Sequence, residues 1–227
     1  MRRWFMENDW AVVESSGAGN GWGGDASRLS YEQAAAWAMT LVPIADVTVL
    51  GRSMGSLVAY WLATYSEFSP LVRNLIINSG TTDLIARYAA SSGSDMRAMN
   101  AAYGVAPTTD KNEAAFAAAA VGHDPMQFPT GIWADKRVLQ LWGSADTTVV
   151  PEAHGQAWVT KYGAHTKATV VDVRANGDHG WDNGSYLQMD AMTSFLTAER
   201  PPTGVGFVVR RVWVIADGEP TPVQVFV

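Results

Sequence analysis

The sequence predicts a three-layer α/β fold, in which a mostly parallel sheet is covered by helices on both faces. Strand-like and helix-like segments alternate along the chain, and this order is typical of parallel βαβ units. The strand-like segments are near-continuous apolar runs, as expected for strands buried on both faces of a sheet. With 227 residues, the chain has the length of one large domain.

The first third of the chain contains five predicted elements. Its strands are apolar and rich in β-branched residues, which favour the pleated conformation. The first helix follows Ser30, a typical N-cap residue, and Pro43 ends it. The second helix has apolar residues on several faces, as a buried helix does. In chain order these elements are strand 10–14, helix 31–42, strand 47–50, helix 56–65 and strand 71–78.

The middle and the end of the chain differ in character. The segment from Thr81 to about Asp135 is rich in alanine, methionine and small polar residues, which predicts two or three helices with loops. Residues 201–227 have β-branched runs around the turn ADGEP and predict a β-hairpin appendage beyond a main domain of residues 1–200. Between these two segments we expect strand 137–142, helix 151–162, strand 166–173 and helix 185–199.

Composition excludes several classes of function. The formal charge is -6, and no Lys/Arg cluster exceeds the pairs 2–3 and 210–211, so the electrostatic footprint of a nucleic-acid-binding protein is missing. No run of 18 apolar residues predicts a membrane span, and no apolar segment follows Arg2 and Arg3 to form a secretory signal. The absence of cysteine excludes disulfides and thiolate metal sites but leaves the compartment open. No metal or cofactor is expected.

A candidate nucleophile lies between the second predicted strand and the following helix. Gly51-Arg52-Ser53-Met54-Gly55 is a Gly-x-Ser-x-Gly pattern in the strand-turn-helix context of a nucleophile elbow. Side chains at positions 51 and 55 would collide with the strand and the helix, and the turn forces Ser53 toward strained backbone angles. The hydroxyl of Ser53 would then stand above the sheet, close to a helix N-terminus that favours negative charge.

His179 and Asp146 are the expected partners of Ser53. His179 lies in the glycine-rich loop ANGDHGWDNG after the last strand of the main domain, where an imidazole can reach a serine above the carboxyl ends of the strands. Asp146 follows the fourth strand and would orient the imidazole through a hydrogen bond. Asp83, after the third strand, is the alternative acid.

The other three histidines have weaker positions for catalysis. His154 is expected inside a helix, and His165 precedes a strand at the opposite end of the sheet, so both are predicted to lie at the surface. His123 belongs to the middle segment, where it either lines a substrate pocket or is a solvated loop residue.

At these residues the chain resembles the α/β-hydrolase family of serine esterases and lipases. The order Ser53, Asp146, His179 matches the family's order, LWGSADTTVVP resembles its acid turn and GDHGW its histidine loop, over roughly residues 8–199. The resemblance implies that the Met54 N–H supplies one donor of an oxyanion hole and that helices between 81 and 135 form a lid. Five apolar residues of this segment either receive an acyl group or pack in the core: Met96, Met99, Met126, Phe128 and Trp133.

The resemblance leaves one gap. Residues 10–14 and the glycine loop after them resemble the family's fourth strand and its loop, so strands one to three and the second oxyanion donor have no counterpart before them. Either the strand 10–14 doubles as the oxyanion strand, with a second N–H from Ser15, Ser16 or Gly17, or another polypeptide supplies the missing strands. The second alternative is preferred, because an absent central strand leaves backbone groups of both neighbours unpaired.

Two functions of different classes follow. The first is a serine esterase that cleaves a small-molecule or polymer-linked ester through an acyl-enzyme intermediate. The second is a structural or adhesion subunit of a larger assembly, which carries a hydrolase domain of reduced or no activity. The second rests on the incomplete sheet and on C-terminal strands suited to pairing with another chain. Residues 203–227 also resemble the ends of bacteriophage minor tail proteins, which implies a location in a virion.

Overall fold

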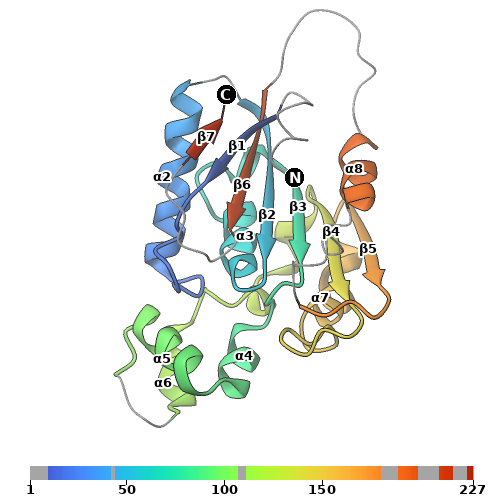
Figure 1. The fold of residues 1–227 in the computed structure, drawn as a ribbon. Helices are drawn as coiled ribbons and strands as arrows, with labels where there is room; N and C mark the ends of the chain where they lie inside the picture. The colour runs from blue at the N-terminus through green and yellow to red at the C-terminus, as the bar shows by residue number, and fades with distance from the viewer. Residues whose placement is uncertain are drawn as a thin grey trace, which may run out of the picture.

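A mostly parallel sheet forms the centre of the molecule (Figure 1). The computed structural model describes residues 10–41, 44–106, 111–179 and 189–198, and the backbone of 210–216 and 224–226. Within these ranges the strand order is β5-β4-β3-β2-β6-β1-β7, and every pairing is parallel except that of β1 with β7. The strands are β1 (Trp10–Glu14), β2 (Ile44–Arg52), β3 (Val72–Asn78), β4 (Arg137–Gly143), β5 (Ala168–Arg174), β6 (Arg210–Ala216) and β7 (Gln224–Phe226).

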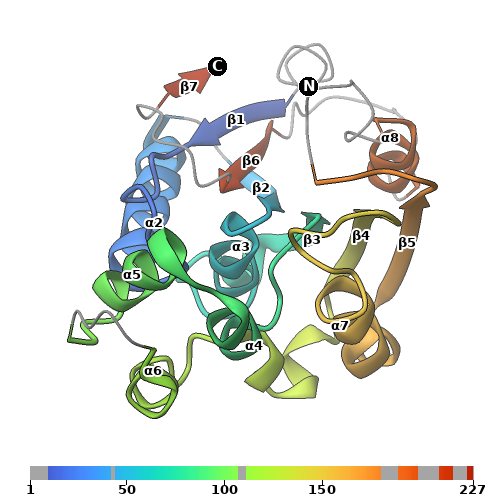
Figure 2. The same cartoon turned by 60° about the horizontal axis from the view of Figure 1, so that its bottom comes forward.

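Helices cover both faces of this sheet (Figure 2). Successive strand residues point to opposite faces. Val13, Val49 and Ile77 therefore pack with the helices of one face, and Val12, Leu50 and Ile76 with the helix of the other. The first face carries α2 (Asp25–Leu41), α3 (Gly55–Thr64) and α7 (Gly155–Tyr162), and the second carries α8 (Met189–Thr197). The predicted three-layer α/β class is confirmed.

A helical segment connects β3 to β4 and lies at the end of the sheet toward which the arrows of these strands point (Figure 1). Its buried methionines, Met96 and Met99, pack in a cluster with Trp22, while Phe128 and Trp133 belong to the main core. Met126 is partly buried against that core, so core packing accounts for all five apolar residues singled out in this segment. The segment contains α4 (Leu84–Ala90), α5 (Gly93–Ala102), α6 (Glu113–Ala119), η2 (Pro125–Gln127) and η3 (Thr130–Trp133).

The remaining short elements and boundaries differ little from expectation. Single 3₁₀ turns precede β3, at η1 (Ser69–Leu71), and β5, at η4 (Gly163–His165). The first helix begins at Asp25, before the expected cap at Ser30. The predicted helix start at 185 and the turn at 217–220 lie outside the described residues. Among the described residues, no helix is long and apolar enough to cross a lipid bilayer.

The C-terminal strands correct the expected topology. β6 lies between β1 and β2 and is parallel to both, whereas β7 pairs antiparallel with the other edge of β1. Because β1 separates them, β6 and β7 do not form the predicted hairpin outside the main domain. The position between β1 and β2, which we expected another polypeptide to fill, is occupied by this chain's own strand. The backbone groups of β1 and β2 thus find their partners within the chain.

Candidate active site

Ser53 lies on the tight turn between β2 and α3. Its φ of +48° is in the left-handed region, which is strained for a serine, as the sequence predicts. A Cβ atom on Gly51 would lie 2.7 Å from the Cα of Ser56, so only glycine allows the strand and the helix to approach so closely. The N–H of Ser53 donates to the carbonyl of Asn78 (3.1 Å), and its carbonyl accepts from Thr81 (3.0 Å). These bonds fasten the turn to the end of β3.

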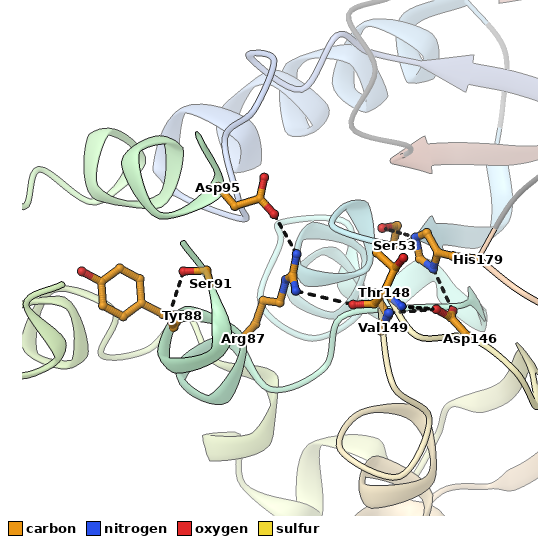
Figure 3. A network of polar contacts seen from close by, with 9 residues as sticks. All are labelled: Ser53, Arg87, Tyr88, Ser91, Asp95, Asp146, Thr148, Val149 and His179. Atoms are coloured by element: carbon orange, nitrogen blue, oxygen red, sulfur yellow. Dashed lines mark hydrogen bonds and ion pairs between the residues drawn. The ribbon is translucent and has the colours of Figure 1, made fainter. Parts of the chain in front are cut away.

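The structure brings Ser53, His179 and Asp146 into one hydrogen-bonded chain (Figure 3). His179 Nδ1 lies 2.7 Å from Asp146 Oδ2, and its Nε2 lies 2.9 Å from Ser53 Oγ. Because an ionised carboxylate only accepts, Nδ1 carries the proton, and Nε2 of the neutral ring accepts from the serine hydroxyl. The Asp146 side chain is fully buried and that of His179 is 19% exposed. This arrangement allows the imidazole to remove the proton of the serine.

Asp146 is held as an anion by the turn in which it lies. Its Oδ1 accepts from the N–H groups of Thr148 and Val149, both at 2.9 Å. Burial by itself would raise the pKa of Asp146, but the hydrogen bonds from His179 and from these two amides outweigh burial and lower it. The carboxylate is therefore ionised at neutral pH and oriented toward His179.

Close backbone packing brings the acid turn and the histidine loop together. A Cβ on Gly143, the last residue of β4, would lie 2.2 Å from the carbonyl oxygen of Gly177. The N–H of Ala145 donates to that same carbonyl (2.8 Å), and the N–H of Ser144 donates to Arg174 (2.9 Å). The two glycines thus set the distance between the segments that carry Asp146 and His179.

Asp83, the alternative acid, has another role in the structure. It is the N-cap of α4, and its side chain accepts from the N–H of Ala86 at 2.7 Å. The carboxylate that reaches His179 is that of Asp146.

The glycine loop after β1, residues 15–24, lies beside the turn that carries Ser53. A narrow cavity between them is lined by residues that include Gly17, Trp22 and Met54. Met54 is the N-cap of α3, so its N–H precedes the amides that bond within the helix. Of the three expected second donors, the Gly17 N–H already donates to Ser15 Oγ (3.2 Å).

His154 corrects the expectation of a surface histidine. It lies just before α7, as the N-cap, because α7 begins only at Gly155, and it is 5% exposed. Its Nδ1 accepts from the N–H groups of Thr82 (3.4 Å) and Asp83 (3.3 Å). Burial lowers the pKa of His154 to about 4, so the ring is neutral at pH 7. Gly155 was the sequence signal that the helix starts later, because glycine is unfavourable in a helix interior.

The remaining two histidines differ in their exposure. His165 is exposed, as predicted. His123 is partly buried in the part of the middle segment after α6, where its Nδ1 lies 3.2 Å from the carbonyl of Gly23 and its ring packs edge-on against Tyr103. It therefore fastens the glycine loop to the helical segment.

Arg87 of α4 joins the helical segment to the acid turn (Figure 3). Its Nη2 lies 2.7 Å from Asp95 Oδ2, and its Nη1 donates to the carbonyl of Thr148 at 3.5 Å. The guanidinium also lies over the ring of Trp22, 5.6 Å from its centre. No sequence pattern marks Arg87, because its partners come from three separate parts of the chain.

Comparison with solved structures supports this architecture. No protein-family model and no curated protein matches the sequence. An acylaminoacyl peptidase from Pyrococcus horikoshii matches with a TM-score of 0.58 and 15% identity, over 82% of this chain and 29% of that chain. A puromycin-hydrolyzing peptidase from Mycobacterium tuberculosis matches with a TM-score of 0.56 and 17% identity, over 91% of this chain and 28% of that chain.

These matches concern the fold. The chain spans less than a third of the length of either peptidase. Neither is a phage tail protein, so the comparisons give no support to the expected resemblance of residues 203–227 to minor tail proteins. With a tight turn at Ser53 between β2 and α3 and a mostly parallel sheet, the protein has an α/β-hydrolase-like fold.

Proposed function

We propose that the protein is a serine hydrolase that cleaves a carboxylic ester through an acyl-enzyme intermediate. Ser53 attacks the ester carbonyl, and His179 takes the proton of its hydroxyl. His179 then protonates the leaving alcohol, and a water molecule activated by the same imidazole releases the acid. Asp146 keeps His179 in the required tautomer and stabilises the imidazolium that forms.

One observation carries this proposal: the hydrogen-bonded chain from Asp146 through His179 to Ser53, on a serine with φ of +48°. A hydroxyl at this distance from Nε2 has its base in place before substrate binds. Hydrogen bonding alone also occurs between structural residues. The strained, glycine-flanked turn is the feature that a merely structural serine does not need.

In the proposed reaction, the N–H of Met54, at the N-terminus of α3, stabilises the negative charge of the transition state. The glycine loop is the proposed source of the second donor, from the N–H of Ser15 or Ser16, since that of Gly17 is engaged within the loop. Loss of one such donor costs about 10²- to 10³-fold in turnover, so the loop conformation matters for the rate.

The helical segment of α4, α5 and α6 is proposed to act as the lid over the site. Arg87 connects this segment to the acid turn by its hydrogen bond to the carbonyl of Thr148. It connects the segment to the glycine loop by its cation–π contact with Trp22. Between α5 and the glycine loop lies a pocket of about 330 Å³. Small residues line it: Ala18, Asn20, Gly21, Gly24, Ala26, Ala98, Ala101 and Ala102.

Labelling with a fluorophosphonate probe tests the nucleophile. We expect the probe to modify wild-type protein at Ser53, to be identified by peptide mass spectrometry, and to leave Ser53→Ala unmodified. Ser56→Ala is the matched control, because Ser56 lies in the same turn region but is fully buried. An unlabelled wild type with an intact circular dichroism spectrum would reject the proposal.

The bond that is cleaved requires a separate comparison. Amide hydrolysis would use the same three residues, and the two solved structures named above are peptidases. Rates on a p-nitrophenyl ester and on the p-nitroanilide of the same acyl group separate the two activities. We expect the ester to be cleaved much faster, and equal or faster cleavage of the anilide would replace esterase with amidase.

The alternative function, a structural or adhesion subunit without strong activity, has less support from the structure than the hydrolase. From the sequence, that alternative rests on an incomplete sheet and on a separate C-terminal hairpin. β6 occupies the position between β1 and β2, so the sheet is not incomplete there. β7 pairs with β1, so the C-terminal strands do not form a separate hairpin.

A further inference from the structure

The buried imidazole of His154 connects two chain segments that flank Ser53. On one side, the N–H groups of Thr82 and Asp83 converge on Nδ1, at 3.4 Å and 3.3 Å. On the other side, the backbone of His154 belongs to the stretch that follows Asp146, where its main-chain N–H donates to the carbonyl of Pro151 (3.2 Å). The side chain of His154 therefore bonds the loop after β3 to the stretch that follows the acid turn.

The β3 loop is in turn bonded to the nucleophile. The N–H of Thr81, the residue before the two amides that His154 accepts, donates to the Ser53 carbonyl at 3.0 Å. Thr82, whose N–H is one of the two that His154 accepts, is fully buried, so water has no access to replace the imidazole as the partner of that amide. A short connection thus runs from Ser53 through its hydrogen bond with Thr81, along the backbone to Thr82 and Asp83, and through their hydrogen bonds to His154.

Only a neutral ring can serve in this position. Two N–H groups point at Nδ1, so Nδ1 must keep its lone pair and Nε2 must carry the proton. The charged groups that face the ring are Asp83, Arg87 and Asp146, whose effects oppose one another, and burial disfavours the imidazolium. The ring differs in this respect from His179, which must gain a proton during the proposed reaction.

We propose that His154 is a positioning residue, whose neutral imidazole keeps Ser53 in register with the Asp146–His179 pair. The role rests on the proposed serine hydrolase function, and His154 itself touches none of the reacting atoms. A displacement of about 1 Å at a catalytic group costs on the order of 10²-fold in rate, so a modest shift of the β3 loop is enough to be measured.

Paired substitutions test this role. His154→Leu keeps the volume but has no acceptor, whereas His154→Asn places a carbonyl oxygen near the position of Nδ1 and remains a good N-cap for α7. We expect His154→Leu to lower kcat by about 10- to 100-fold with little change in KM, and His154→Asn to recover most of the loss. His165→Leu and His165→Asn, at an exposed position, are the matched controls and leave kcat unchanged.

A second readout does not depend on hydrolysis. We expect the Nδ1 proton of His179, bonded to Asp146 at 2.7 Å, to give a low-field proton NMR resonance that reports the geometry of this pair. We expect His154→Leu to shift or broaden it, and to accelerate amide exchange at Thr81, Thr82 and Asp83, while His154→Asn restores both. If the wild type fails to hydrolyse esters, the proposed function is rejected. If His154→Leu still changes the resonance and the amide exchange in that case, the positioning role of His154 is supported.

The opposite results would overturn the inference. An active wild type whose His154→Leu variant keeps its kcat and its low-field resonance leaves the hydrolase function intact and removes the role of His154. Equal losses in His154→Leu and His154→Asn would also overturn it, because a merely space-filling ring is not rescued by an acceptor.

Discussion

Removing residues 201–227 is the strongest perturbation that the topology offers, because it deletes β6 from the middle of the sheet. The shortened chain would still contain the sequences of β1 to β5 and of the helices. However, β1 and β2 would each face an empty position where β6 lies. If residues 201–227 were an appendage, the shortened chain would be as stable as the full one.

The size of the effect follows from the pairing. Five register pairs join β6 to β1 and seven join it to β2. At about one hydrogen bond per pair and about 1 kcal/mol for each bond, the strand contributes on the order of 10 kcal/mol. The total stability of a domain is about 5–15 kcal/mol, so the shortened chain is expected to be unfolded or aggregated in water.

Urea unfolding followed by circular dichroism measures this effect, with two comparisons. A chain that ends at residue 220 keeps β6 and loses β7, whose three residues form only an antiparallel edge pairing. We expect that chain to stay folded, with a small decrease in its midpoint. A peptide of residues 201–227 added to the shortened chain should restore cooperative unfolding. A monomeric chain of residues 1–200 with an unchanged midpoint would refute the reasoning.

Three further predictions concern single residues. Gly51→Ala should cost about 1–3 kcal/mol in urea unfolding, because the new Cβ would lie 2.7 Å from the Cα of Ser56, while Gly131→Ala, where a Cβ has open space, should cost little. Asp146→Asn should lower kcat at pH 7 by about 10⁴-fold with the fold retained, and a loss below tenfold would contradict its role in orienting His179. Because the pKa of His154 falls from 6.5 in the unfolded chain to about 4, its stabilising effect is complete above pH 6.5 and is lost as the pH falls toward 4. The loss amounts to about 3 kcal/mol at most, and urea midpoints at pH 7 and pH 4.5 should therefore differ less in His154→Asn than in wild type.

The sequence by itself was sufficient to predict the local features of the site. Alternation of apolar strands and helices predicted the layer architecture, and the glycine at position 51 predicted the tight turn. The chain order of Ser53, Asp146 and His179 placed each at the carboxyl end of a strand, and the structure joins them by hydrogen bonds. Such features are set by residues close in sequence, or by the rule that parallel strands end at the same edge of the sheet.

His154 shows where local pattern was insufficient. A helical reading of 151–162 put it on a helix surface, but it lies before α7 and its partners are backbone amides more than 70 residues earlier in the chain. Whether a histidine is buried and neutral depends on what packs against it, and no short-range pattern encodes that.

The position of β6 was likewise decided only by the tertiary structure. The run VWVIA at 212–216 is near-continuously apolar, which is typical of a central parallel strand, yet nothing nearby in sequence says which strands it joins. The partners of such a strand are decided by which neighbouring strands would otherwise have edges with unpaired backbone groups. Here the parallel strands β1 and β2 leave one place between them, and backbone N–H and C=O groups buried there require a partner. The sequence therefore determined that residues 210–216 form a strand, and the sheet determined where that strand lies.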